Sequence, residues 1–182
     1  MSTRFWVLAG GKKIHAYNNI IQIPIVPNKF SFVLKLHIVN FPEGLYFAAC
    51  WCPDCVASKP FVSAAFNSQK DGEKLFDLVY ISSDNDSAQM KGEIEGGWDA
   101  VAFEKMGERS KLKKHFGVCA QKEMEELDIS GEQRKGGIPT LILLEKKSCQ
   151  VLRADAIPDL MGDKKIDNPL DLWKSLLSEN SP

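Results

Sequence analysis

The sequence predicts an α/β domain in which helices flank a central mixed β-sheet. An apolar segment of strand type, Leu45–Ala49, leads through a tight turn into a segment with helical spacing, Val56–Lys70. A second apolar strand is expected at Leu75–Ser82, and a strand–helix–strand series forms a parallel pair with a right-handed crossover. A later strand, Leu141–Glu145, is followed by a turn and by a returning, antiparallel strand at Cys149–Arg153. Parallel and antiparallel pairs in one chain indicate a mixed sheet.

Length and composition are typical of one soluble globular domain. The chain has 182 residues, of which 44% are hydrophobic and 26% charged. The formal net charge of −1 gives no reason to expect binding to nucleic acid or to an anionic membrane. No apolar run approaches the roughly 20 residues of a membrane span, and five cysteines are an odd number for a secreted disulfide scaffold. We therefore expect a cytoplasmic monomer that forms a single domain over residues 1–182.

Two cysteines separated by two residues, Cys52 and Cys55, stand where the first strand turns into the helix. Pro53 suits the first helical turn, because its missing N–H is not needed there. Unpaired N–H groups and the helix dipole favour negative charge at this end, and Cys-X-X-Cys motifs at helix starts lower a thiol pKa from ~8.5 towards ~7. We expect Cys52 to attack a substrate disulfide. Cys55, one turn further and deeper, would then attack the mixed disulfide.

Two other interpretations of these cysteines stay open. A zinc site usually has four ligands; Cys50 could join Cys52 and Cys55, but no fourth ligand is near in sequence. The chain could instead be a redox-inactive binding or scaffold module that retains the fold. Reduction of insulin disulfides would separate an enzyme from a scaffold, and elemental analysis would detect a metal.

The motif Trp51-Cys52-Pro53-Asp54-Cys55 resembles the active site of thioredoxin-fold proteins, and more of the chain resembles their tryparedoxin and nucleoredoxin branch. The further similar segments, in family order, are 46–55, 76–84, 97–103, 111–118 and 138–141. The resemblance implies a thioredoxin-like fold that reduces protein disulfides without a bound cofactor. It also implies that Cys52 is the nucleophile, that Cys55 resolves the mixed disulfide, and that the site is shaped by Trp51, Pro53, Asp54, Ile138 and Pro139.

The resemblance carries further expectations about the site. In this family the proline equivalent to Pro139 is cis, and it would present the Ile138 backbone to an extended substrate as an added strand does. Asp54 stands where the branch has proline, and its carboxylate would repel a thiolate at Cys52. Tyr46 replaces the buried aspartate that assists proton transfer in bacterial-type thioredoxins. Electrons would come from a dithiol of the trypanothione or glutathione type, or from a flavoprotein reductase, and would pass to a protein disulfide such as that of a peroxidase.

Two segments depart from the family. Residues 1–43 match it poorly, and we expect two or three extended strands there. Residues 119–137 are dense in charge and end in a double glycine, where the family has only a few residues. We interpret residues 119–137 as an insertion before the cis-proline, partly helical around residues 121–127. It could be a tolerated surface insertion, or it could form a lid or a partner-selecting arm.

Local patterns predict the remaining elements. Asp84–Ser87 offers N-cap residues for a helix that ends near Glu95, and Trp98–Phe103 is expected to be a connecting loop. Glu108–Phe116 is expected to be a helix whose basic face is solvated or helps to steer an anionic thiol. The last amphipathic helix, Pro169–Leu177, would use Trp173 for packing.

Overall fold

The computed structural model describes residues 8–9, 12–13, 42–69, 76–146 and 148–179. The chain divides into two compact units, residues 1–39 and 40–182. In the first unit, β1 (Leu8–Ala9) and β2 (Lys12–Lys13) pair antiparallel. Most of the extended segments expected over residues 1–43 lie outside the described residues, and the single domain over residues 1–182 stays a prediction. The following description concerns the second unit.

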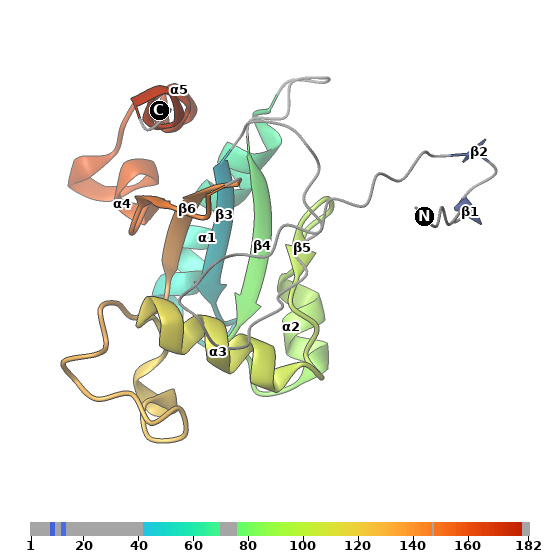
Figure 1. The fold of residues 1–182 in the computed structure, drawn as a ribbon, viewed down its shortest axis with the longest axis vertical. Coiled ribbons are helices and arrows are strands. Elements are labelled where there is room, and N and C mark those ends of the chain that lie inside the picture. The colour runs from blue at the N-terminus through green and yellow to red at the C-terminus, as the bar shows by residue number, and fades with distance from the viewer. Residues whose placement is uncertain (1–7, 10–11, 14–41, 70–75, 147, 180–182) are drawn as a thin grey trace, which may run out of the picture. The chain divides into compact units, whose positions relative to one another are not determined.

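The second unit is built on a five-stranded mixed sheet with the strand order β5-β4-β3-β6-β7 (Figure 1). The strands are β3 (Pro42–Ala48), β4 (Asp77–Ser82), β5 (Asp99–Ala100), β6 (Thr140–Glu145) and β7 (Val151–Arg153). The central strand β3 runs parallel to β4 and antiparallel to β6. β7 pairs antiparallel with β6 at the edge of the sheet. The predicted α/β fold with a mixed sheet is confirmed.

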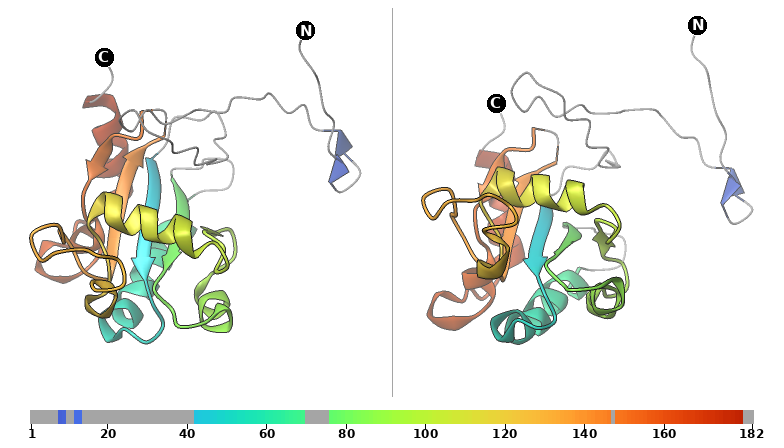
Figure 2. Two further views of the ribbon diagram at one scale, coloured as in Figure 1. Left: turned by 60° about the horizontal axis from the view of Figure 1, so that its bottom comes forward. Right: turned by 90° about the horizontal axis from the view of Figure 1, so that it is seen from below.

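Helices cover both faces of this sheet. The α-helices of the described residues are α1 (Pro53–Asn67), α2 (Ser87–Glu93), α3 (Met106–Phe116), α4 (Ile157–Leu160) and α5 (Pro169–Glu179). Two 3₁₀-helices, η1 (Gln121–Glu123) and η2 (Gly162–Lys164), follow α3 and α4. α3 crosses one face of the sheet, whereas α1 packs on the other face (Figure 2). Every residue of β3 is buried, as expected for an apolar strand that is covered on both sides.

Aromatic side chains make up much of the core beside α1. The ring of Tyr46 in β3 lies edge-on to Trp98, with ring centroids 5.9 Å apart. Phe76 is in edge contact with Trp173 of α5 at 5.3 Å, and only 1% of Trp173 is exposed. Trp173 is therefore a packing residue, as the amphipathic pattern predicted.

Three local predictions were wrong or incomplete. The expected loop Trp98–Phe103 contains β5, which forms because Asp99 and Ala100 pair with Val79 and Tyr80 of β4. A two-residue strand made by such pairing leaves no alternation in the sequence. The helix expected around residues 121–127 is regular only over η1, and turns follow it. The basic face of α3 is not wholly solvated, because Arg109 and Lys113 are buried.

The insertion, residues 119–137, closes on itself at its two ends. Val118 and Gly136 form a parallel bridge, and the N–H of Cys119 donates to the carbonyl of Gly136 at 3.4 Å. Gly117 ends α3 in the left-handed conformation, with φ 67°. A Cβ there would lie 2.4 Å from the carbonyl oxygen of Gln133, so only glycine lets the end of the insertion pack against the end of α3.

Candidate active site

The two cysteines of the motif meet at the start of α1. β3 ends at Ala48 and α1 begins at Pro53, which places Cys52 at the N-cap position. The N–H of Cys55 donates to Cys52 Sγ at 3.3 Å. The sulfur therefore takes the role that a serine or aspartate oxygen usually has at a helix N-cap. The sulfur thus lies at the end of α1 that carries partial positive charge, with a backbone N–H directed at it.

The environments of the two thiols differ. Cys55 is 2% exposed and Cys52 is 6% exposed. Burial raises the pKa of the Cys55 thiol, and a hydrogen bond to Cys52 and the nearby charge of Asp54 raise it further. Cys55 is therefore held as a neutral thiol. The structure brings Cys52 and Cys55 together as the sequence indicated, while their separate roles as nucleophile and resolving cysteine stay predictions.

The loop before β6 lies against Cys52. The Ile138–Pro139 peptide bond is cis, as the resemblance implied, and Cys52 Sγ lies 3.7 Å from the carbonyl oxygen of Ile138. Ile138 and Pro139 are both partly exposed. The carbonyl of Ile138 therefore lies beside Cys52 Sγ, near the sulfur at which a substrate disulfide would react.

Trp51 and its neighbour Cys50 are tied to the end of β4. The Trp51 indole N–H donates to the carbonyl of Ser83 at 2.9 Å, and the N–H of Cys50 donates to Asp84 Oδ1 at 2.7 Å. Trp51 is 36% exposed, and the Lys122 ammonium lies 3.8 Å from the centroid of its ring. An exposed aromatic ring is thus held in one orientation beside Cys52.

The first turn of α1 presents Pro53 and Asp54 to solvent, and both residues are exposed. Asp54 makes no ion pair with any residue that the structure describes. The carboxylate thus lies in the same helical turn as the two cysteines, where its charge acts on the buried thiol of Cys55.

Two buried hydroxyl groups, those of Tyr46 and Ser58, donate hydrogen bonds to the backbone carbonyl of Cys55. Tyr46 Oη lies 3.1 Å from Ser58 Oγ and donates to the Cys55 carbonyl at 3.5 Å. Ser58 Oγ donates to the same carbonyl at 3.1 Å. Burial raises the pKa of Tyr46, so its hydroxyl remains protonated. Sequence reasoning singled out Tyr46 but missed Ser58, whose position one turn after Cys55 was the available signal.

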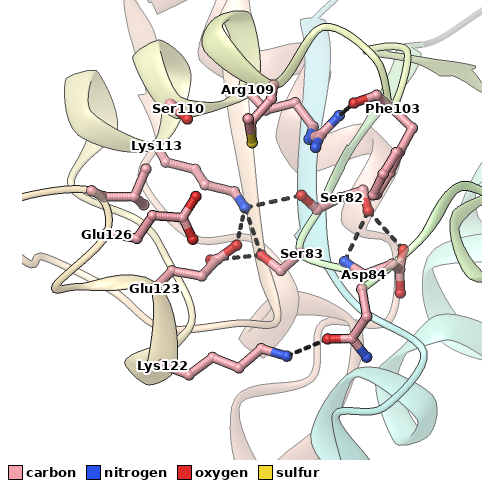
Figure 3. A pocket seen from close by; sticks show the side chains of 13 residues that line it. Ser82, Ser83, Asp84, Phe103, Arg109, Ser110, Lys113, Lys122, Glu123 and Glu126 are labelled. Carbon is pink, nitrogen blue, oxygen red and sulfur yellow. Dashed lines mark hydrogen bonds and ion pairs between the residues drawn. The ribbon is translucent and has the colours of Figure 1, made fainter.

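The insertion is joined to α3 and β4 around a pocket of about 330 Å³ (Figure 3). The Lys113 ammonium donates to the carbonyl of Ser82 at 2.9 Å and to Ser83 Oγ at 2.8 Å, and it pairs with Glu123. Burial lowers the pKa of Lys113, whereas the charge of Glu123 raises it. Arg109, a further lining residue, donates to the carbonyls of Ala102 and Phe103. Both buried cations are thus occupied in holding the fold together.

In the part of the chain that the structure describes, no group of three or more His, Cys, Asp or Glu residues is arranged to hold a metal ion. Cys50, Cys52 and Cys55 are all within that part of the chain and are all free thiols. Among the same residues, no helix is both long enough and apolar enough to cross a bilayer.

The sheet, the dithiol at a helix N-terminus and the adjacent cis-proline define a thioredoxin-fold protein with a Cys-X-X-Cys site. A family model described as thioredoxin-like matches residues 41–151. The chain therefore belongs to the thioredoxin-like family, as the motif resemblance indicated.

The relatives point to the nucleoredoxin and tryparedoxin branch. Nucleoredoxin of Homo sapiens is 23% identical over 149 residues, which are 81% of this chain and 30% of that protein. Tryparedoxin from Trypanosoma brucei superposes with a TM-score of 0.53 at 24% identity, covering 70% of this chain and 77% of that one. Native tryparedoxin I from Crithidia fasciculata gives a TM-score of 0.52 at 26% identity, covering 70% and 76%. The chain spans less than a third of the length of the nucleoredoxin that it matches.

Proposed function

We propose that this protein is a thiol-disulfide oxidoreductase that reduces protein disulfides through Cys52 and Cys55. The observation that carries the proposal is the hydrogen bond from the Cys55 N–H to Cys52 Sγ at the N-cap of α1. It directs a backbone donor at one sulfur, while the second sulfur is kept one helical turn away and buried. Membership of the thioredoxin-like family supports the same chemistry.

The reaction has two exchange steps. The Cys52 thiolate attacks one sulfur of the substrate disulfide, which forms a mixed disulfide and releases the other substrate sulfur as a thiolate. Cys55 then gives its proton to solvent and attacks Cys52 Sγ, which forms the Cys52–Cys55 disulfide and releases the second substrate thiolate. The substrate gains two electrons and the protein loses two. Burial of Cys55 raises its pKa, so loss of this proton limits the second step at neutral pH.

Reducing equivalents must return to the oxidised pair from another molecule. Within the proposal, they come from a dithiol of the trypanothione or glutathione type or from a flavoprotein reductase, and a peroxidase is one candidate protein substrate. A monomer in the cytoplasm is part of the same proposal. Supplying each donor in turn to the oxidised protein, and measuring its free thiols, would identify the donor.

Insulin-disulfide reduction with dithiothreitol tests the activity. We expect turbidity to rise faster with wild-type protein than with buffer, and we expect Cys52→Ser to abolish the acceleration. Cys55→Ser should accumulate the mixed disulfide with its substrate, because resolution is blocked. Cys149→Ser is a matched control, since Cys149 lies in the turn between β6 and β7. A wild-type protein as inactive as Cys52→Ser would refute the proposal and favour a binding module.

A further inference from the structure

The insertion places an exposed cation, Lys122, beside the candidate site. The Lys122 ammonium lies 3.8 Å from the centroid of the Trp51 ring and donates to Asn85 Oδ1 at 2.7 Å. The side chain is exposed, and it forms no ion pair with a carboxylate in the described part of the chain. An ammonium has three N–H donors. One is donated to Asn85 Oδ1 and another faces the Trp51 ring, so one remains for a ligand.

The residue that follows Lys122 fixes the position of this cation. Glu123 accepts a hydrogen bond from Ser83 Oγ at 2.9 Å and pairs with Lys113 (Figure 3). It also accepts a hydrogen bond from the N–H of Ala120 at 3.0 Å. η1 is therefore attached to the end of β4, which also accepts the Trp51 indole N–H through the Ser83 carbonyl. A lysine whose backbone and ammonium are both restrained loses less freedom when it pairs with a ligand.

The other charges near Trp51 are arranged differently. The Asp84 carboxylate is buried and already accepts hydrogen bonds from the hydroxyls of Tyr80 and Ser82 and from the N–H of Cys50. Asp54 is exposed in the first turn of α1. In the described part of the chain, the exposed charges near the motif include the Lys122 ammonium at Trp51 and the carboxylates of Asp54 and Asp86, of which Asp86 acts on Cys50. Of these three groups only Lys122 can bind an anion.

We propose that Lys122 is a specificity-determining residue, which selects protein disulfides that have a carboxylate side chain next to the reacting cystine. This inference rests on the proposed function and names its substrate class. The disulfide packs beside the ring of Trp51, and the neighbouring carboxylate of the substrate pairs with the Lys122 ammonium. The insertion, residues 119–137, is thus the partner-selecting arm of the site.

Peptides with one intramolecular disulfide test this selection. Three peptides would be identical except for Glu, Gln or Lys next to the cystine, and kcat/KM would be measured for each. For wild-type protein we expect the Glu peptide to be reduced about two- to fivefold faster than the Lys peptide, since exposed charge pairs contribute up to about 1 kcal/mol. Salt at 0.5 M should reduce the preference by screening it.

Charge variants identify the residue responsible. Lys122→Gln should remove the preference and Lys122→Glu should reverse it, whereas Lys135→Gln, an exposed lysine of the same insertion, should keep it. Equal preferences in wild type and Lys122→Gln would overturn the inference, even if insulin reduction confirmed the proposed function.

A binding measurement tests the role of Lys122 without requiring that the protein reduce any peptide. Analogues of the peptides that carry serine in place of cysteine can be titrated against the Cys52→Ser protein while Trp51 is observed by NMR. Tighter binding of the Glu analogue, lost in a Cys52→Ser, Lys122→Gln double variant, supports the selection even if no peptide is reduced. Equal binding of the Glu and Lys analogues counts against it.

Discussion

Lys113 of α3 and Glu123 of the insertion form an ion pair whose side chains are only 4% and 16% exposed. The two residues belong to segments with no evident relation in the sequence, a basic helix and a charged insertion. Their pairing, together with the hydrogen bonds of both side chains to Ser83, joins α3, the end of β4 and η1. The stability of this part of the fold should therefore depend on the pair.

Glu123→Gln should lower the free energy of unfolding by about 3 kcal/mol, because it leaves the Lys113 ammonium buried without a counter-charge. Chemical denaturation by urea measures the change. The double variant Lys113→Met/Glu123→Gln should lose less than the sum of the two single variants, because the unpaired charge is then absent. Lys105 and Glu108 provide an exposed control pair, at 61% and 39% exposure, for which Glu108→Gln should cost at most about 0.5 kcal/mol. Equal costs for Glu123→Gln and Glu108→Gln would contradict the assigned role of the buried pair.

The raised pKa of Cys55 predicts how its reactivity depends on pH. Below the pKa, the thiolate fraction rises about tenfold per pH unit, so alkylation of Cys55 by iodoacetamide should accelerate tenfold per unit from pH 7 to pH 9. In urea-unfolded protein the alkylation rate should level off above about pH 8.5, the ordinary pKa of a cysteine thiol. Peptide mapping by mass spectrometry measures both rates. A plateau below pH 9 in the folded protein would show that burial does not hold the proton.

The raised pKa of Cys55 also determines how the free energy of unfolding changes with pH. Folded Cys55 holds its proton more tightly than unfolded Cys55, so the stabilisation is complete below about pH 9 and is lost as pH rises further. Asp54→Asn should lower the pKa of Cys55, because the Asp54 carboxylate is one of the charges that raise it. An unchanged alkylation profile in this variant would exclude that contribution.

Tyr46→Phe removes only the buried hydroxyl that donates to the carbonyl of Cys55. The ring contacts with Trp98 and Tyr80 remain, while Ser58 loses one partner and keeps the carbonyl of Cys55. We expect a loss of about 1 kcal/mol in the free energy of unfolding, measured by urea denaturation. Tyr46→Leu, which also removes the ring, should cost at least twice as much. A loss in Tyr46→Phe as large as that in Tyr46→Leu would mean that the hydroxyl, not the ring, dominates.

Arg153→Met tests a second buried charge, that of Asp159 in α4, which Arg153 of β7 pairs with. The Asp159 carboxylate is fully buried and is contacted by Arg153 and by the indole N–H of Trp173 at 3.1 Å. Removing the arginine should cost about 2 kcal/mol, less than for a fully buried pair because Arg153 is 41% exposed. Thermal unfolding followed by tryptophan fluorescence measures the loss. Lys165→Met, at an exposed lysine, should have little effect, and an equal shift in both variants would refute the role of the pair.

Local patterns predicted the elements that depend on local chemistry. The apolar run at Leu45–Ala49 became the buried strand β3, and Asp86 caps α2 through hydrogen bonds to the N–H groups of Ala88 and Gln89. The cysteine spacing and Pro53 placed the dithiol at the start of α1. Each of these features follows from residues within a few positions of one another, whose periodicity and capping preferences are readable along the chain.

The partners of the site come from distant positions. β5 exists because an edge of β4 was available, and Lys113 is buried because Glu123 and Ser83 surround its ammonium. A helix pattern could not distinguish this lysine from its solvated neighbours.

The amino-acid sequence alone was therefore enough to predict an α/β fold with a Cys-X-X-Cys pair at a helix N-terminus. Strand periodicity, helix capping and cysteine spacing are local properties of the sequence. Folding in three dimensions was needed to bring Lys122 onto Trp51 and the Ile138 carbonyl to Cys52. Those contacts join residues separated by 71 and 86 positions, and such pairings arise from the packing of whole elements, which no short stretch of sequence encodes.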